Sequence, residues 1–172
     1  MIRRFALASA IFIAAGSAAP AMAGTATSNV QVTATVPVSC TISANTIAFG
    51  NYDPIGTNAT APLEGTGTLT TTCTNGSAVV VTLGQGNNPE ASSTDAGPQR
   101  RLGNGISGDD NDFLSYKIFT EGGGIWGNTT DSSVTVSGTG QQVNTTIYAI
   151  ILPAQNVSSG NYTDTVTATI DF

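Results

Sequence analysis

Residues 148–172 read YAIILPAQNVSSGNYTDTVTATIDF and decide the fold class, because they end on a strictly alternating pattern. One parity of the final positions is apolar: Val166, Ala168, Ile170 and Phe172. The other parity is threonine and aspartate. Successive side chains of a β-strand point to opposite faces, so this pattern predicts one buried and one solvated face. The stretch therefore predicts a strand over residues 163–172 whose apolar side chains enter a core.

A second alternating stretch lies near the start of the chain. Its apolar positions are Val30, Val32, Ala34 and Val36. Pro37 follows, and proline fixes φ and lacks the N–H that a sheet ladder needs. We therefore expect a leading strand over residues 30–36 and a separate strand over 38–42; one continuous edge strand with a bulge at Pro37 is the alternative. Apolar-striped strands at both ends, with no catalytic motif between them, favour assembly by strand exchange.

The first 23 residues have the composition of an export signal. Two arginines precede an apolar stretch at residues 5–15, and Ala21, Met22 and Ala23 form a small-x-small cleavage site. The apolar stretch is too short to span a bilayer, and no later segment is long and apolar enough. We expect cleavage after Ala23 and export through the inner membrane to the periplasm; an uncleaved anchor helix is the alternative.

The charge balance excludes nucleic acid as a partner. The chain has Lys+Arg 5 and Asp+Glu 11, and losing the two signal arginines moves its net charge from −6 to −8. Phosphate backbones require a basic surface, and anionic membranes attract basic segments. Removing 23 of 172 residues leaves 149, which suits one domain with its own core.

The two cysteines, Cys40 and Cys73, both lie in the exported part. In an oxidising compartment such a pair predicts one disulfide. Two free thiols or a metal-bound pair are the alternatives. The chain has no histidine, which disfavours a metal site.

Helical periodicity is nearly absent after the signal, and short apolar or alternating runs recur between turn residues. Besides the strands already named, we expect strands at residues 46–49, 67–73, 78–83, 113–119, 133–136 and 145–152. Many short strands separated by turns predict an antiparallel sandwich. Residues 87–112 are rich in Gly, Asn, Asp and Ser, and predict a surface loop that crosses between the sheets.

No catalytic constellation stands out, and we expect no enzyme activity, no metal and no cofactor. Without histidine the chain lacks the commonest general base and the usual Ser or Cys triads. The acidic run at residues 109–112 lacks EF-hand spacing, so a solvated turn is favoured over a calcium site. Four aromatic residues could line a sugar-binding surface, but core packing is favoured: Tyr116, Phe119, Trp126 and Tyr148.

Several short motifs occur in a specific order over essentially the whole mature chain. They are the alternating segment 29–36 before Cys40, IAFGNYDP at 47–54, LTTTC at 69–73, RRL at 100–102, LSYKIF at 114–119, WGN at 126–128, GNYTDTV at 160–166 and Phe172. This order resembles the spore coat protein U (SCPU) domain family, which includes pilins of archaic chaperone–usher pili of the Csu type. Glu121, where Asp is expected, and the small Ala34 are minor departures.

The resemblance implies an all-β fold: an incomplete immunoglobulin-like antiparallel β-sandwich that lacks its last strand and is completed by donor-strand complementation. It implies a signal peptide at 1–23, an N-terminal donor-strand extension at 24–37 and an SCPU/pilin domain at 38–172. The donor side chains would be Val30, Val32, Ala34 and Val36. The C-terminal strand, through Val166, Ala168, Ile170 and Phe172, would border the open groove and face a chaperone.

The implied function is that of a structural subunit of a secreted chaperone–usher pilus, which serves adhesion and biofilm formation at the cell surface. Its partners would be identical or related pilin subunits, a periplasmic chaperone and an outer-membrane usher. A non-fibrous spore or cell-coat protein with the same domain is the main alternative. A sugar-binding tip module and a secreted hydrolase have less support from the residues.

Overall fold

The computed structural model describes residues 22–106 and 112–172. The expected signal residues up to position 21, and Asp109, Asp110 and Asn111 of the acidic run, lie outside the described residues. The chain divides into two units, Met1–Thr35 and Val36–Phe172. In the first unit, residues 22–35 form no strand and their side chains are exposed.

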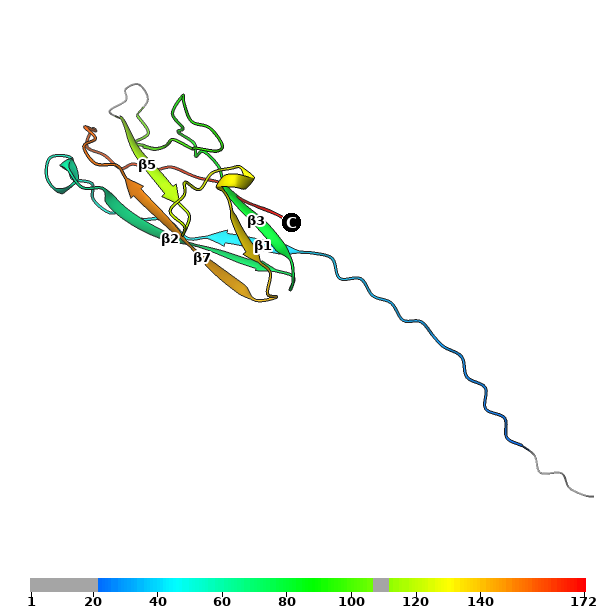
Figure 1. Ribbon diagram of the computed structural model, residues 1–172. Helices are drawn as coiled ribbons and strands as arrows, with labels where there is room; N and C mark the ends of the chain where they lie inside the picture. Colours follow the sequence, from blue (N-terminus) through cyan, green and yellow to red (C-terminus); the bar gives the residue numbers. More distant parts are fainter. Residues whose placement is uncertain (1–21, 107–111) are drawn as a thin grey trace, which may run out of the picture. The chain divides into compact units, whose positions relative to one another are not determined.

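In the described part of the second unit, five strands form an antiparallel sheet in the order β1-β2-β7-β5-β4. Their bounds are Cys40–Ala44 for β1, Leu63–Cys73 for β2, Gln142–Ile151 for β7, Phe113–Phe119 for β5 and Arg100–Gly103 for β4. Figure 1 shows β2, β7 and β5 side by side. The β2–β7 pairing runs from Leu63 with Ile151 to Thr72 with Gln142.

The second sheet, again counted over the described residues, has three strands in the order β6-β3-β8. They are β6 (Val134–Ser137), β3 (Ala78–Leu83) and β8 (Ala168–Asp171), and short 3₁₀ helices lie at η1 (Thr57–Ala59) and η3 (Thr130–Ser132). Before β8, Thr163 forms a bridge with Gly103 at the end of β4. The C-terminal segment thus runs from an edge of the larger sheet to an edge of the smaller one.

The two sheets share one core. Its buried members come from both: Leu69, Cys73, Val79, Val81, Leu83, Leu114, Tyr116, Ile118, Trp126, Val136, Ile147, Ala149 and Ile151. Alternation along each strand places these side chains on the facing sides of the sheets. The Trp126 indole N–H donates to the Val81 carbonyl at 3.0 Å, which satisfies the buried polar atom of a residue that is otherwise apolar.

The predicted all-β, two-sheet fold is confirmed, but four details of the prediction are wrong. Residues 30–36, 46–49 and 163–167 form no strand, and β4 lies inside the stretch that was expected to be a loop. β4 escaped detection because its inward residue is Arg100, which is fully buried and breaks the apolar alternation. The other three segments have strand-like sequences but no ladder partner.

Candidate functional site

Two adjoining cavities form a groove along one side of the sandwich. Their volumes are about 660 and 290 Å³, and both are lined by Ile47, Phe49 and Leu102. The walls of the groove come from residues 44–54 on one side and 157–168 on the other. We call residues 45–52 the N-terminal lip and residues 161–167 the C-terminal lip. The smaller cavity reaches five buried residues of the core: Leu69, Leu83, Tyr116, Ile118 and Ile147.

The side chains of the N-terminal lip alternate although it is not a strand. Ile47 and Phe49 are half-buried, and Ala48 between them is exposed. Two glycines of β2 make room for these side chains: a Cβ on Gly67 would lie 2.7 Å from Ile47 Cγ1, and one on Gly65 would lie 2.7 Å from Phe49 Cδ1. The Asn45 N–H donates to the Thr68 carbonyl of β2 at 2.9 Å, and beyond this bond the lip rests on the inner face of β2 through its side chains.

Tyr52 holds the end of the N-terminal lip in place. Its hydroxyl donates to the Leu152 carbonyl at 3.0 Å and accepts from the Gln155 N–H at 3.0 Å. Nearby, the buried Asn58 side chain accepts from the Asp53 N–H at 2.9 Å. The motif at residues 47–54 thus supplies both the groove wall and the hydrogen bonds that fix it.

The C-terminal lip continues into β8 with one unbroken alternation. Val166, Ala168 and Ile170 are half-buried and pack against the core, as the sequence predicts. Phe172 is 64% exposed, so its predicted core position is wrong in the isolated chain. The reason is that β8 ends at Asp171, which pairs with Val80 of β3, and nothing covers the next side chain.

The groove runs between two sheet edges. β1 is the edge of the larger sheet and pairs only with β2, while β8 is the edge of the smaller sheet and pairs only with β3, among the residues described. Edge strands present unpaired N–H and C=O groups that can pair with another chain. The site therefore combines an apolar floor with backbone groups available for a further strand.

A polar cluster lies at the floor and C-terminal wall of the groove. Asp164 and Tyr116 both line the smaller cavity, and the Tyr116 hydroxyl donates to Asp164 Oδ2 at 2.7 Å. The Asn87 N–H donates to Asp164 Oδ1 at 2.8 Å. Behind them Arg100 donates from Nη2 to the carbonyls of Leu83 at 3.0 Å and Trp126 at 2.8 Å.

Burial shifts the proton affinities of this cluster. It raises the pKa of the Tyr116 phenol above its usual range, and the hydrogen bond to Asp164 acts in the same direction. Burial also lowers the pKa of Arg100, while its electrostatic interactions with Tyr116 and Asp164 act to raise it. A buried arginine is tolerated when carbonyls and a nearby carboxylate replace water.

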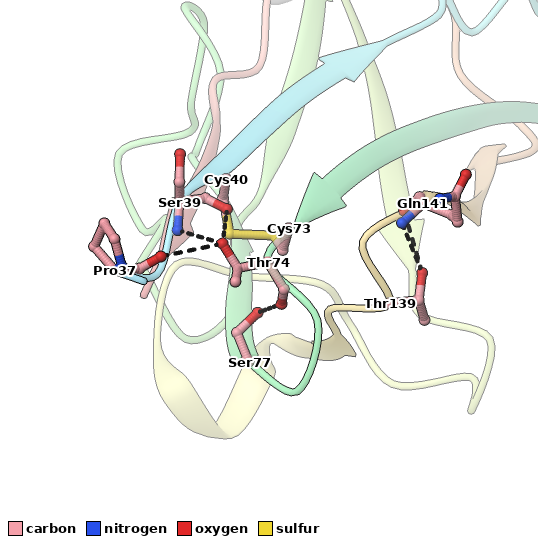
Figure 2. Close-up of a disulfide and its surroundings, with 8 residues drawn as sticks. All are labelled: Pro37, Ser39, Cys40, Cys73, Thr74, Ser77, Thr139 and Gln141. Carbon is pink, nitrogen blue, oxygen red and sulfur yellow. Dashed lines mark hydrogen bonds between the residues drawn. A yellow bond between two sulfur atoms is a disulfide. The ribbon is translucent and has the colours of Figure 1, made fainter. Parts of the chain in front are cut away.

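The predicted disulfide is present at the start of β1, so the free-thiol and metal-pair alternatives are wrong. Cys40 and Cys73 are paired across β1 and β2, with their Cα atoms 4.2 Å apart. Figure 2 shows Thr74 beside this bridge, where its hydroxyl accepts from the Ser39 N–H at 3.0 Å and lies 3.3 Å from the Pro37 carbonyl oxygen. The chain is thus anchored just after residue 36.

The proposed donor residues have exposed side chains. Val30 is 85% exposed, Val32 88% and Val36 79%, and Ala34 is exposed as well. Large apolar side chains rarely remain so exposed in a row without a partner. Their role as a donor strand stays a prediction.

The remaining predictions concern a sugar-binding surface, the acidic run, metal ligands and membrane spans. Tyr116 and Trp126 are buried in the core, as favoured, so a sugar-binding surface that includes them is wrong. Asp112 is buried and accepts from Asn104 Nδ2 at 2.9 Å. Across the described ranges no three His, Cys, Asp or Glu side chains cluster as metal ligands would. Within the same ranges no helix has the length and hydropathy to cross a bilayer.

The Spore Coat Protein U domain model matches residues 26–169. The chain belongs to the Spore Coat Protein U domain family. "Protein U" of Myxococcus xanthus is another similar protein, 41% identical over 161 residues that make up 89% of this chain and 88% of that protein. The matched range of this SCPU-domain chain includes both lips and the exposed segment before Pro37.

A solved structure shares the fold. It is the CsuC–CsuE chaperone–tip adhesion subunit pre-assembly complex from the archaic chaperone–usher Csu pili of Acinetobacter baumannii, with a TM-score of 0.52 and 24% identity. The match covers 80% of this chain and 40% of that chain. The SCPU-domain chain therefore spans less than half the length of this structural relative.

Proposed function

We propose that this SCPU-domain chain is a structural subunit of a secreted chaperone–usher pilus, that it polymerises by donor-strand exchange, and that the polymer serves adhesion and biofilm formation. One observation carries the proposal: the chain has both an open apolar groove and an exposed segment with a strand-like sequence. Two lips with strand-like alternation border an apolar groove, and a third alternating segment, residues 30–36, is exposed.

The chemistry of the spare segment fits the groove. A strand laid between the lips would pair its backbone with their free edges, and its inward residues would recur at period two. Burying Val30, Val32, Ala34 and Val36 of the next subunit would contribute roughly 5–7 kcal/mol of gross transfer free energy. Backbone pairing along both lips would add to this without covalent chemistry.

A subunit with an open groove also needs a partner that covers the groove until the subunit polymerises. Apolar surface beside unpaired strand edges is an aggregation hazard, so a subunit needs protection before it polymerises. We propose that a periplasmic chaperone lends a strand first, along the edge formed by Val166, Ala168, Ile170 and Phe172, and that an outer-membrane usher exchanges it for the next subunit. The structural relative, a chaperone–tip adhesion subunit pre-assembly complex, supports a chaperone step before assembly.

The test places a charge on one face of the donor segment. Val32→Asp should abolish surface fibres seen by electron microscopy, because an unpaired carboxylate in an apolar groove costs several kcal/mol. Folded monomer should still accumulate in the periplasm. Thr33→Asp is the matched control, since its side chain lies on the opposite parity and should leave fibres intact. Normal fibres from the Val32→Asp variant would contradict donor-strand exchange through this segment.

A non-fibrous coat is the second candidate, favoured by the 41% identity to "Protein U" and by the family's name. Donor-strand pairing could build such a layer as well as a fibre. The form of the polymer separates the two: thin fibres support the pilus, and an amorphous layer on the cell or spore supports the coat.

A further inference from the structure

Asp164 interrupts the row of apolar and aromatic residues on the inward face of the C-terminal lip. Along residues 161–171 the even positions face inward, and all are apolar or aromatic except Asp164. Burying part of a carboxylate in an apolar row costs free energy unless hydrogen bonds compensate for lost water. Such local violations concentrate at positions with a functional role.

The surroundings of Asp164 are shaped to receive it. Tyr116 and Asn87 donate to its two carboxylate oxygens at 2.7 and 2.8 Å. A Cβ built on Gly86 would overlap this carboxylate, and Gly86 has a φ of +84°, so only glycine fits beside it. The fully buried Arg100 lies near enough for its charge to interact with that of Asp164. Tyr162 of the same lip donates to the Ser158 carbonyl, four positions away, whereas the donors to Asp164 lie 48 and 77 positions away.

Among the described residues, the backbone of the lip is hydrogen-bonded at two points. Thr163 exchanges hydrogen bonds with Gly103 at 2.9 Å, and the Gly84 N–H donates to the Thr167 carbonyl at 2.9 Å. These three bonds go to Gly103 at the end of β4 and to Gly84 just after β3. Because successive peptide groups point to opposite edges, those of Asp164 and Val166 point to the other edge, where no backbone bond is formed among the described residues. A strand with so few ladder bonds is prone to slip, and a slip of one residue turns every side chain to the other face.

We propose that Asp164 is a positioning residue that fixes the register of the C-terminal lip, so that an incoming donor strand pairs in a single alignment. The inference rests on the proposed donor-strand exchange. A buried polar group with a unique partner set can specify one arrangement among several that apolar packing alone would allow. Ala168 is already aligned by its pairing with Leu83 at the start of β8, so the lip before it is the part whose alignment needs fixing. Val166 would pack acceptably in neighbouring registers, whereas the Asp164 carboxylate meets its donors in one only.

Cross-linking can measure that register. The acceptor is the full mature chain with Val32→Asp, which disables its own donor segment, and with one cysteine placed at Thr163, Thr165 or Thr167 on the exposed face of the lip. The probe is a synthetic peptide of residues 26–37 carrying Thr33→Cys. Outward residues directly opposite each other come close enough for a disulfide, while diagonal neighbours do not.

With Asp164 intact, one of the three lip positions should cross-link at least about tenfold more than the other two. With Asp164→Ala, the three yields should come within about threefold of each other. Tyr116→Phe removes one donor to the carboxylate and should shift the yields in the same direction; it keeps the test valid if Asp164→Ala does not fold. Asp131→Asn, on exposed η3, is the control.

The outcomes separate the two proposals. If the peptide cross-links to no lip position in any chain, donor-strand exchange itself is wrong, and this inference falls with it. If one position dominates equally with and without Asp164, exchange stands and the register role of Asp164 is overturned. A lower melting temperature with an unchanged cross-link pattern would likewise assign Asp164 a purely structural role.

Discussion

The β2–β7 ladder and the two lips of the groove have similar sequences but different structures. Both alternate more buried with more exposed side chains along the chain, and most of the inward side chains of the lips are apolar. β2 and β7 are paired from Leu63 with Ile151 to Thr72 with Gln142. The lips, residues 45–52 and 161–167, are extended over the same core and form no ladder. The difference is that β2 and β7 each have a neighbouring strand to pair with, and the lips do not.

Alternation therefore determines which face a segment buries, and a partner determines whether it becomes a strand. Backbone N–H and C=O groups need hydrogen bonds, and in a sheet these come from adjacent strands. A segment with a strand-like pattern therefore stays out of a sheet when no neighbouring strand is present to pair with it. In this chain the two lips are such segments and border the same groove. Residues 30–36 are a third such segment.

The comparison can be tested with two isoleucines that approach the same glycine. Ile147 is buried opposite Gly67 in the β2–β7 pairing, and Ile47 of the lip contacts Gly67 from the groove side. Ile147→Ala should lower the free energy of unfolding by about 3 kcal/mol, because its side chain is buried at the floor of the groove and shortening it leaves a cavity there. Ile47→Ala should cost about 1 kcal/mol, since its side chain is half-exposed.

Denaturant titration of the monomer measures both changes. The two isoleucines should differ less in an assembled polymer, because a donor strand would cover Ile47. Equal costs in the monomer would mean that the lip is already as well packed as the ladder, and the distinction between the two regions would fail.

The sequence predicts the face of nearly every strand but not the partners. Ala78–Leu83 and Phe113–Phe119 have the expected bounds, because apolar runs between turn residues leave little freedom. β4 could not be predicted, since its inward residue is Arg100, which donates to the carbonyls of Gly84 and Leu83, 16 and 17 positions away in the chain. The groove could be inferred only through family resemblance, and the Asp164–Tyr116 contact joins residues 48 positions apart, beyond any local pattern.

The polar cluster of the groove predicts a loss of stability at alkaline pH. Burial raises the pKa of Tyr116 above its ordinary value of 10.0, so the folded chain holds this proton more tightly than the unfolded chain. The stabilisation is complete below pH 10 and is lost as the pH rises further. Tyr116→Phe should cost about 1 kcal/mol at neutral pH through the lost hydrogen bond, and its disadvantage should shrink above about pH 10.

Urea titrations at pH 7, 9, 10 and 11 measure this difference. Tyr148→Phe is the control, because Tyr148 is exposed on β7 and should leave the pH dependence of the wild type unchanged. A constant gap between the wild type and Tyr116→Phe across this pH range would show that the Tyr116 proton is not coupled to folding.

The smallest effect on stability should come from a change at Phe172, which remains exposed beyond the end of β8. Phe172 is 64% exposed and lies beyond the last β8 pair, so Phe172→Ser should change the free energy of unfolding by less than about 0.5 kcal/mol.

The effect of Phe172→Ser should appear in cells, where a chaperone strand along this edge would cover the ring. We expect periplasmic accumulation to fall several-fold. Ile55→Ser removes an equally uncovered apolar side chain at a turn, 95% exposed, and should leave accumulation unchanged. Equal accumulation of both variants would place the chaperone contact elsewhere, whereas a fall specific to Phe172 would show that the open edge is occupied before assembly.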